Sequence, residues 1–208
     1  MIFIHRGKIK KNIKENTLKG FKLSVLNGYN LETDIHFNIN NIPICYHDFS
    51  LNRLYKSKKK IKNLSNREIT KYKILKLKNL IKIIKRKTKL LIEVKPQLNK
   101  NTSKSLYEQI KNNRNILVIS FKEKNLIKMY KINKKLKLGL IIRSSKKLKF
   151  INSKINKNHI NFFVFNKSYL NNKKINRINK KKYFYTIKNP LKYKSVNKKN
   201  LIIENILL

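Results

Sequence analysis

The feature that most constrains the fold of this chain is an alternation of short apolar runs with longer amphipathic, lysine-rich segments. The apolar runs have the length of β-strands, and this alternation is typical of parallel β/α units. Eight strands are expected on this basis, centred on Ile2–Ile4, Leu31–Ile35, Leu90–Val94, Ile116–Ile119, Leu138–Ile142, Asn161–Phe165, Tyr183–Ile187 and Leu201–Ile203.

Eight such units indicate an α/β fold, a small (β/α)8 barrel of the TIM-barrel type, and 208 residues lie near its lower length limit. One domain over residues 1–208 is expected, because no Gly/Pro linker or internal repeat divides the chain. The first helix is the clearest, with Thr17 as its N-cap and Gly28 placed to end it. A weaker helix is expected over Lys122–Lys134.

Three segments depart from the simple repeat. An apolar run at 42–48 follows the turn Asn40–Asn41 and predicts a hairpin-like extra strand after the second strand. The basic stretch 49–80 is expected to be an insertion packed over the barrel mouth. Since only a few residues follow the last strand, we expect no eighth helix, and the apolar flank left open would favour a partner or a homo-oligomer.

The charge of the chain is extreme, with 53 Lys and Arg against 9 Asp and Glu and a formal net charge of +44. Such an excess predicts weak, nonspecific association with polyanions or an anionic membrane surface. The lysines are spread from Lys8 to Lys199 among Asn and Ile, whereas a dedicated nucleic-acid face concentrates arginines and aromatic residues. The pattern therefore favours compositional drift over a selected binding surface.

Several features indicate a cytoplasmic protein. The single cysteine, Cys45, excludes an internal disulfide framework and fits a reducing compartment. No apolar stretch approaches the length needed to span a bilayer. The opening residues read at once as a buried strand that ends in His5-Arg6-Gly7, which leaves no room for a signal peptide.

Acidic residues are so scarce that their placement is informative. Glu32 and Asp34 are two positions apart, so on a strand they project from the same face. Glu93 and Lys95 repeat this spacing at the end of the third strand. Side chains at the carboxyl ends of barrel strands converge on one mouth, where active sites of this fold lie. Three carboxylates converging there would suit one divalent cation, Mg²⁺ or Ca²⁺.

Two histidines approach the same rim. His5 ends the first strand, and His47 is expected to end the extra strand after the second. A pair of imidazoles facing a metal-bound phosphate would supply a general acid and a general base near neutral pH. Arg6 and Lys95 would neutralise the non-bridging phosphate oxygens. The whole set describes metal-assisted cleavage of a phosphodiester.

Other residues receive structural interpretations. His36 shares the strand face of the two carboxylates, and a supporting polar role is favoured over ligation. Cys45 fits a small buried residue better than a nucleophile. Residues 15–17 are expected to cap the first helix and brace the site. Phe121 and Tyr185 form either an apolar wall for the substrate or part of the core, and both alternatives stay open.

Several short motifs follow one another along the first part of the chain. They are His5-Arg6-Gly7, Glu15-Asn16-Thr17, Glu32-Thr33-Asp34-Ile35, Pro43-Ile44-Cys45-Tyr46-His47-Asp48 with Leu51 and Arg53, Ile92-Glu93-Val94-Lys95, and Ser120-Phe121. Their order and spacing closely resemble the glycerophosphodiester phosphodiesterase family. The resemblance runs from residue 2 to about residue 121 and is looser beyond. Tyr185 and Asn38 stand where that family commonly has Trp and Thr.

The resemblance implies a metal-dependent phosphodiesterase and a role for each residue of the set. These roles are acid and base for His5 and His47, metal ligation for Glu32, Asp34 and Glu93, and phosphate contact for Arg6 and Lys95. It also implies the pathway: the glycerol 2-hydroxyl attacks phosphorus, the alcohol leaves, and a cyclic phosphate is hydrolysed to glycerol 3-phosphate.

Three functions stay open on the sequence. The first, which we favour, is hydrolysis of a small glycerophosphodiester substrate, because every charged site position is retained in a chain otherwise drifting to Lys and Asn. The second is a phosphodiesterase of the same superfamily that acts on lysophospholipids and differs only in the apolar wall. The third is a basic module on a decayed barrel that binds nucleic acid or anionic lipid, with an affinity that falls steeply with salt.

Overall fold

The computed structural model describes residues 1–84, 87–188 and 200–204. Eight parallel strands close into a barrel, because β1 pairs with both β2 and β9. The predicted (β/α)8 architecture is confirmed. The barrel strands are β1 (Ile2–His5), β2 (Asn30–Phe37), β4 (Leu90–Val94), β5 (Ile116–Ser120), β6 (Leu138–Ile142), β7 (Phe162–Asn166), β8 (Lys181–Ile187) and β9 (Asn200–Ile203).

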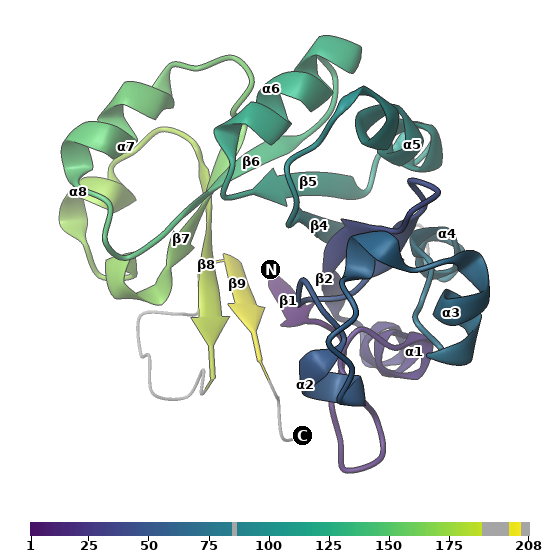
Figure 1. The fold of residues 1–208 in the computed structure, drawn as a ribbon. Coiled ribbons are helices and arrows are strands. Elements are labelled where there is room, and N and C mark those ends of the chain that lie inside the picture. Colours follow the sequence, from purple (N-terminus) through teal and green to yellow (C-terminus); the bar gives the residue numbers. More distant parts are fainter. Residues whose placement is uncertain (85–86, 189–199, 205–208) are drawn as a thin grey trace.

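Helices surround the strands on the outside of the barrel (Figure 1). The α-helices are α1 (Leu18–Leu26), α2 (Asn52–Tyr55), α3 (Asn66–Lys71), α4 (Leu77–Ile81), α5 (Lys100–Ile110), α6 (Glu123–Ile132), α7 (Leu148–Ile155) and α8 (Lys173–Asn176), and the 3-10 helices are η1 (Ile61–Asn63) and η2 (Lys167–Tyr169). The Thr17 hydroxyl accepts a hydrogen bond from the Gly20 amide at 3.3 Å, and Gly28 follows the helix in the left-handed region, so both predicted ends of α1 are confirmed.

Alternate residues of each strand enter two different cores, as a closed barrel requires. An outer layer packs between strands and helices and includes Leu31 and Ile92. An inner layer fills the barrel and consists of Phe3, Leu91, Leu117, Ile119, Ile141, Phe162, Val164, Tyr183 and Ile202. Gly139 makes room for this filling, because a Cβ there would lie 2.2 Å from the Phe162 ring. Burial on both sides explains why the strands read as continuous apolar runs.

The predicted extra strand is β3 (Pro43–Cys45), which pairs antiparallel with β2 outside the closed barrel. The turn before it places Asn41 at a φ of 58°. The expectation that His47 ends this strand is wrong by two residues, because β3 stops at Cys45 and His47 lies in the loop beyond.

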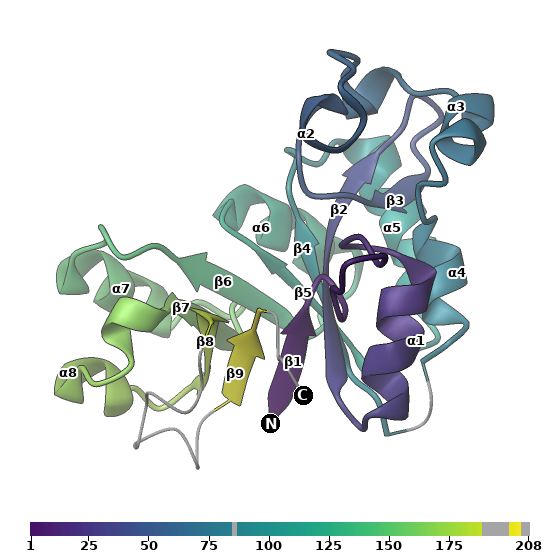
Figure 2. The ribbon, with the colours of Figure 1, turned by 90° about the horizontal axis from the view of Figure 1, so that it is seen from below.

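The segment 49–80 carries α2, η1, α3 and most of α4. Its apolar side chains form a third small core with β3, made of Ile44, Tyr46, Leu51, Ile61, Leu64, Ile69 and Ile74. Figure 2 shows α2 and α3 beyond β3, on the side toward which β2 points. A basic segment can fold here because its buried positions are apolar and its lysines lie on the surface.

The expected absence of an eighth helix concerns residues 205–208, which lie outside the described residues. Within the described ranges, no helix combines the length and apolar character that crossing a membrane demands.

Candidate active site

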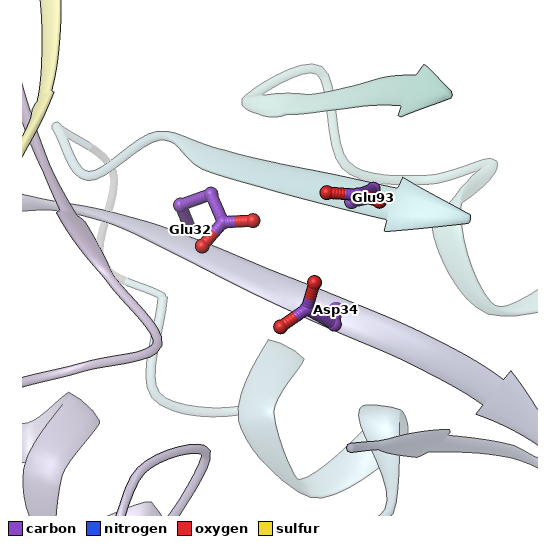
Figure 3. Close-up of side chains that lie close together, drawn as sticks. All are labelled: Glu32, Asp34 and Glu93. Carbon is purple, nitrogen blue, oxygen red and sulfur yellow. The ribbon is translucent and has the colours of Figure 1, made fainter. Parts of the chain in front are cut away.

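Three carboxylates meet at the barrel mouth. Glu32 and Asp34 share one face of β2, and β4 pairs with β2 so that Glu93 lies beside Asp34. One carboxylate oxygen from each residue lies within 4.8 Å of the others, and the three side chains point into the same space (Figure 3). All three residues are buried. The acidic residues selected from the sequence are thus brought together by strand register.

Burial and mutual repulsion set the protonation of this cluster. Burial, followed by the charges of Asp34 and Glu93, raises the pKa of Glu32 well above its usual value. Burial and the charge of Asp34 likewise raise the pKa of Glu93 to about 7. Burial alone would raise the pKa of Asp34 too, but the cations Arg6 and Lys95 outweigh it and hold that pKa below its usual value.

Two basic side chains accompany the carboxylates. Arg6 Nε lies 2.9 Å from Asp34 Oδ2, and Lys95 Nζ lies 3.0 Å from Glu93 Oε1 and 3.5 Å from Asp34 Oδ1. Across the described residues, neither oxygen of Asp34 accepts a hydrogen bond although both are buried. Three carboxylates therefore face only two basic side chains, Arg6 and Lys95. The carboxylate oxygens left without a hydrogen bond form an all-oxygen set that fits a divalent metal ion.

The turn after β1 aims Arg6 back across the mouth. Arg6 and Gly7 both have positive φ, of 58° and 75°. A Cβ on Gly7 would lie 3.1 Å from backbone atoms of α1, so glycine allows the turn to press against that helix. The Arg6 amide donates to Glu32 Oε2 at 3.2 Å, which ties this turn to the carboxylate cluster.

The two candidate histidines sit in different environments. His5 Nε2 lies 3.9 Å from Glu32 Oε2, and burial together with Arg6 lowers the pKa of His5 to about 4. His47 is more open, with 31% of its side chain exposed, and its Nδ1 lies 2.6 Å from Asp48 Oδ1. The first imidazole is thus neutral at pH 7, and the second is oriented by a carboxylate that leaves its Nε2 available.

An ionic chain connects the two histidine loops. Arg53 Nε contacts Asp48 Oδ2 at 2.6 Å, and Arg53 Nη2 contacts Glu15 Oε1 at 2.6 Å. The other oxygen of Glu15 lies 3.4 Å from Arg6 Nη1. The expected bracing role of Glu15 is confirmed by these contacts. The bridging role of Arg53 was missed, although Arg53 belongs to a motif already singled out, because its two partners lie 5 and 38 positions away.

Supporting residues lie around this centre. The Asn16 side chain accepts a hydrogen bond from the Thr33 hydroxyl at 2.8 Å, which ties the loop before α1 to β2. His36 Nε2 lies 3.2 Å from the carbonyl oxygen of His47, and burial lowers the pKa of His36 to about 4. Burial raises the pKa of the Cys45 thiol to about 12, which fits the inert small residue expected there.

Another part of the mouth is aromatic. The rings of Phe121 and Tyr185 meet edge to face at 6.0 Å between centroids and pack on top of the inner core. The guanidinium of Arg143 lies 4.8 Å from the centre of the Phe121 ring. Both residues are half-buried, so one side of each faces the mouth. The position of Arg143 could not be predicted from the sequence, because a single arginine among so many lysines forms no pattern.

A (β/α)8 barrel whose mouth gathers buried carboxylates, basic side chains and histidines belongs to the class of barrel enzymes that cleave phosphate esters. The profile of the glycerophosphoryl diester phosphodiesterase family matches residues 5–203, and the chain belongs to this family. It is therefore a phosphoric diester hydrolase.

Solved structures share the whole architecture. An Oleispira antarctica phosphodiesterase, in complex with the product sn-glycerol-3-phosphate, is 19% identical with a TM-score of 0.83 over 98% of this chain and 92% of that chain. A Thermotoga maritima glycerophosphodiester phosphodiesterase is 20% identical with a TM-score of 0.81 over 98% and 93%. One from Parabacteroides distasonis is 14% identical with a TM-score of 0.79 over 98% and 92%. No curated protein sequence matches the chain.

Proposed function

We propose that this enzyme hydrolyses small glycerophosphodiesters to sn-glycerol 3-phosphate and an alcohol, with one divalent cation, Mg²⁺ or Ca²⁺. The observation that carries the proposal is the buried cluster of Glu32, Asp34 and Glu93 beside two cations and two histidines. The product found in the Oleispira antarctica relative supports the choice of substrate.

Phosphate binding falls to the cluster and its two basic neighbours. A divalent cation held by the three carboxylates would neutralise charge on the phosphodiester and polarise its P–O bonds. The Arg6 guanidinium and the Lys95 ammonium lie beside the same carboxylates, so each can donate hydrogen bonds to a non-bridging oxygen. Because these donors are already in position when the substrate binds, they need not reorient during the reaction, as water molecules would.

Proton transfer falls to the histidines. His5 is neutral at pH 7, so it can accept the proton of the attacking glycerol 2-hydroxyl. His47, oriented through Nδ1 by Asp48, can donate from Nε2 to the oxygen of the leaving alcohol. In hydrolysis of the cyclic phosphate the roles reverse: His47 takes a proton from water and His5 returns one to the 2-oxygen.

The remaining proposals concern the whole chain. We infer one functional unit over residues 1–208, with 49–80 packed over the barrel mouth; the position of α2 and α3 in Figure 2 supports this. The single, buried Cys45 supports a cytoplasmic location. The net charge of +44 supports weak association with polyanions or membrane surfaces. We also propose that the chain forms a homo-oligomer, which size-exclusion chromatography tests.

The test is release of glycerol phosphate from glycerophosphocholine and glycerophosphoethanolamine with Mg²⁺ or Ca²⁺. We expect EDTA and Asp34→Asn to abolish release, and Glu108→Gln, an exposed acid on α5, to retain it. Cation binding gives a second readout, because either ion should raise the melting temperature of the wild type and not of Asp34→Asn. Release that survives EDTA contradicts the metal assignment, and cleavage of lysophospholipids alone contradicts the substrate.

A further inference from the structure

A pocket of about 830 Å³ opens at the end of β2, and its wall begins at His36, two residues after Asp34. Its wall combines the end of β2, the loop after His47, the lysine-rich segment 58–62 and the N-terminal turn of α5. The volume lies in the range of pockets that take small molecules, which is roughly 300–1,000 Å³. Neither the catalytic groups nor the phosphate contacts proposed above fill it.

The pocket continues the active site. His36, Phe49 and Pro96 line it, and each follows a proposed site residue by one or two positions in the chain. The rings of His36 and Phe49 meet at 4.7 Å between centroids. Lys122 joins the two regions, because its Nζ lies 5.9 Å from the centre of the Phe49 ring and 2.7 Å from the carbonyl oxygen of Lys95. A substrate whose phosphate sits at the mouth can therefore extend into the pocket.

Three lysines give the pocket its charge. Lys58, Lys60 and Lys62 line one side, and all three are exposed. Among the residues that the structure describes, none of the three makes an ion pair, whereas Lys59 between them pairs with Glu68 outside the pocket. Within the described ranges, no carboxylate lines this space. Unpaired charges of one sign around a concave surface raise the local concentration of anions.

The remaining lining is apolar or polar and neutral. Phe49 and Ile39 are 60% and 63% exposed, so they offer apolar contact area to an occupant. Asn99 and Thr102 belong to the N-terminal turn of α5, where the helix dipole adds a further positive potential. The pocket thus suits a molecule with a small carbon body and an anionic end.

We propose that this pocket binds the leaving alcohol of the substrate and prefers an alcohol that carries a second phosphate group. The inference rests on the proposed function, since it names a substrate class for the same reaction. The diester phosphate lies at the barrel mouth beside Arg6 and Lys95, the carbon body of the alcohol lies on Phe49, and the terminal phosphate meets Lys58, Lys60 and Lys62.

The experiment compares two substrates that differ only in that phosphate, glycerophosphoglycerol and its terminal phosphate monoester. For the wild type at low ionic strength, we expect kcat/KM to favour the monoester about tenfold, because three exposed lysines each contribute a fraction of the binding energy. In K58Q/K60Q/K62Q the ratio should fall toward one. In K22Q/K131Q/K134Q, which removes three exposed lysines outside the pocket and so matches the net charge, the ratio should be retained.

The outcomes separate the inference from the function on which it rests. If the wild type hydrolyses both substrates equally, or if K58Q/K60Q/K62Q keeps the preference, the inference is overturned and the proposed function stands. If K22Q/K131Q/K134Q loses the preference as fully as K58Q/K60Q/K62Q does, the preference comes from the net charge of the protein, and the inference is again overturned. Faster cleavage of a lysophospholipid than of either substrate would show that the pocket takes an acyl chain. Hydrolysis of neither substrate by folded, cation-loaded protein would overturn both proposals.

Discussion

Two parts of the barrel mouth differ in the side chains that lie above the inner core, at the carboxyl ends of the strands. On β2 and β4 the positions facing the mouth are Glu32, Asp34 and Glu93. Directly after β5 and on β8, the corresponding positions beyond the core are Phe121 and Tyr185. The carboxylates therefore occupy one arc of the mouth, the charged arc, and the two aromatic rings occupy another, the aromatic arc. A barrel can divide these tasks because each strand end is an independent position on one rim.

The division has an energetic side. Buried carboxylates and their partners weaken the fold unless they are fully compensated, whereas the aromatic arc gains stability from contact with the inner core. We expect the charged arc to lower the free energy of unfolding and to be required for kcat. We expect the aromatic arc to raise the free energy of unfolding and to have little effect on kcat.

The largest effect should come from the histidines of the charged arc. We expect His5→Ala and His47→Ala each to lower kcat by about 10²- to 10⁴-fold, because each removes a proton-transfer group. The matched control is His159→Ala, since His159 pairs with Glu123 and not with a carboxylate of the cluster. Steady-state kinetics on glycerophosphocholine measures this. A His5→Ala enzyme within a few-fold of wild type would remove His5 from the chemistry.

The next effect concerns the inner core that supports the aromatic arc. We expect Gly139→Ala to lower the free energy of unfolding by about 2–3 kcal/mol, because its Cβ overlaps a Phe162 ring that is itself held by Tyr183. Denaturant unfolding measures the loss. Adding Phe162→Leu should restore part of it in a double-mutant cycle. Additive losses in the double variant would show that the two side chains do not compete for space.

The stability of the charged arc should depend on pH with a defined sign. The pKa of Glu93 is about 7 in the fold and 4.5 in the unfolded reference, so the folded state binds the extra proton between these values. Wild type therefore loses stability as pH rises from 4.5 to 7. Without divalent cations, Glu93→Gln should be more stable than wild type by about 1–3 kcal/mol at pH 8, and the gain should vanish below pH 4.5.

Thermal melts at pH 4 and pH 8 with EDTA check this sign. Glu108→Gln is the control, because Glu108 is exposed and should give no gain at either pH. A Glu93→Gln protein that is less stable than wild type at pH 8 would mean that the ion pair with Lys95 outweighs the repulsion in the cluster.

The smallest effect should come from the aromatic arc itself. We expect Phe121→Ala to raise KM about threefold with little change in kcat, because a wall contributes binding in the ground state and the transition state alike. Phe150→Ala, which removes a ring that lies under Lys146 and Lys154, serves as the control. A fall in kcat with unchanged KM would place Phe121 in the chemistry and blur the contrast between the two arcs.

The strands could be predicted from the sequence because a strand buried on both faces is a continuous run of apolar residues. The apolar runs at 90–94 and 138–142, for example, match β4 and β6 residue for residue. The carboxylates of the candidate site were found for a related reason, since the two-residue spacing of Glu32 and Asp34 states which face of the strand they share.

What sequence reasoning missed depends on contacts that no local pattern records. Arg53 lies on α2, which the third small core holds in place, and from there it reaches Glu15 across 38 positions. The pocket lysines resemble every other lysine of this chain. Only the fold shows that three of them line a concave surface and form no ion pair with any residue that the structure describes. Composition also hides α2, α3 and η1, because short helices in a basic segment are stabilised by tertiary packing rather than by propensity.

The closure of the barrel by β1 and β9 has a consequence for biosynthesis. β1 carries His5, and it acquires its second neighbour only when residues 200–203 have left the ribosome. By then β2 and β4 are long complete, so an unfinished chain can gather its acidic cluster while His5 stands on an open sheet edge. The strand that carries His5 is therefore the last of the three strands carrying His5, Glu32, Asp34 and Glu93 to gain both of its neighbours.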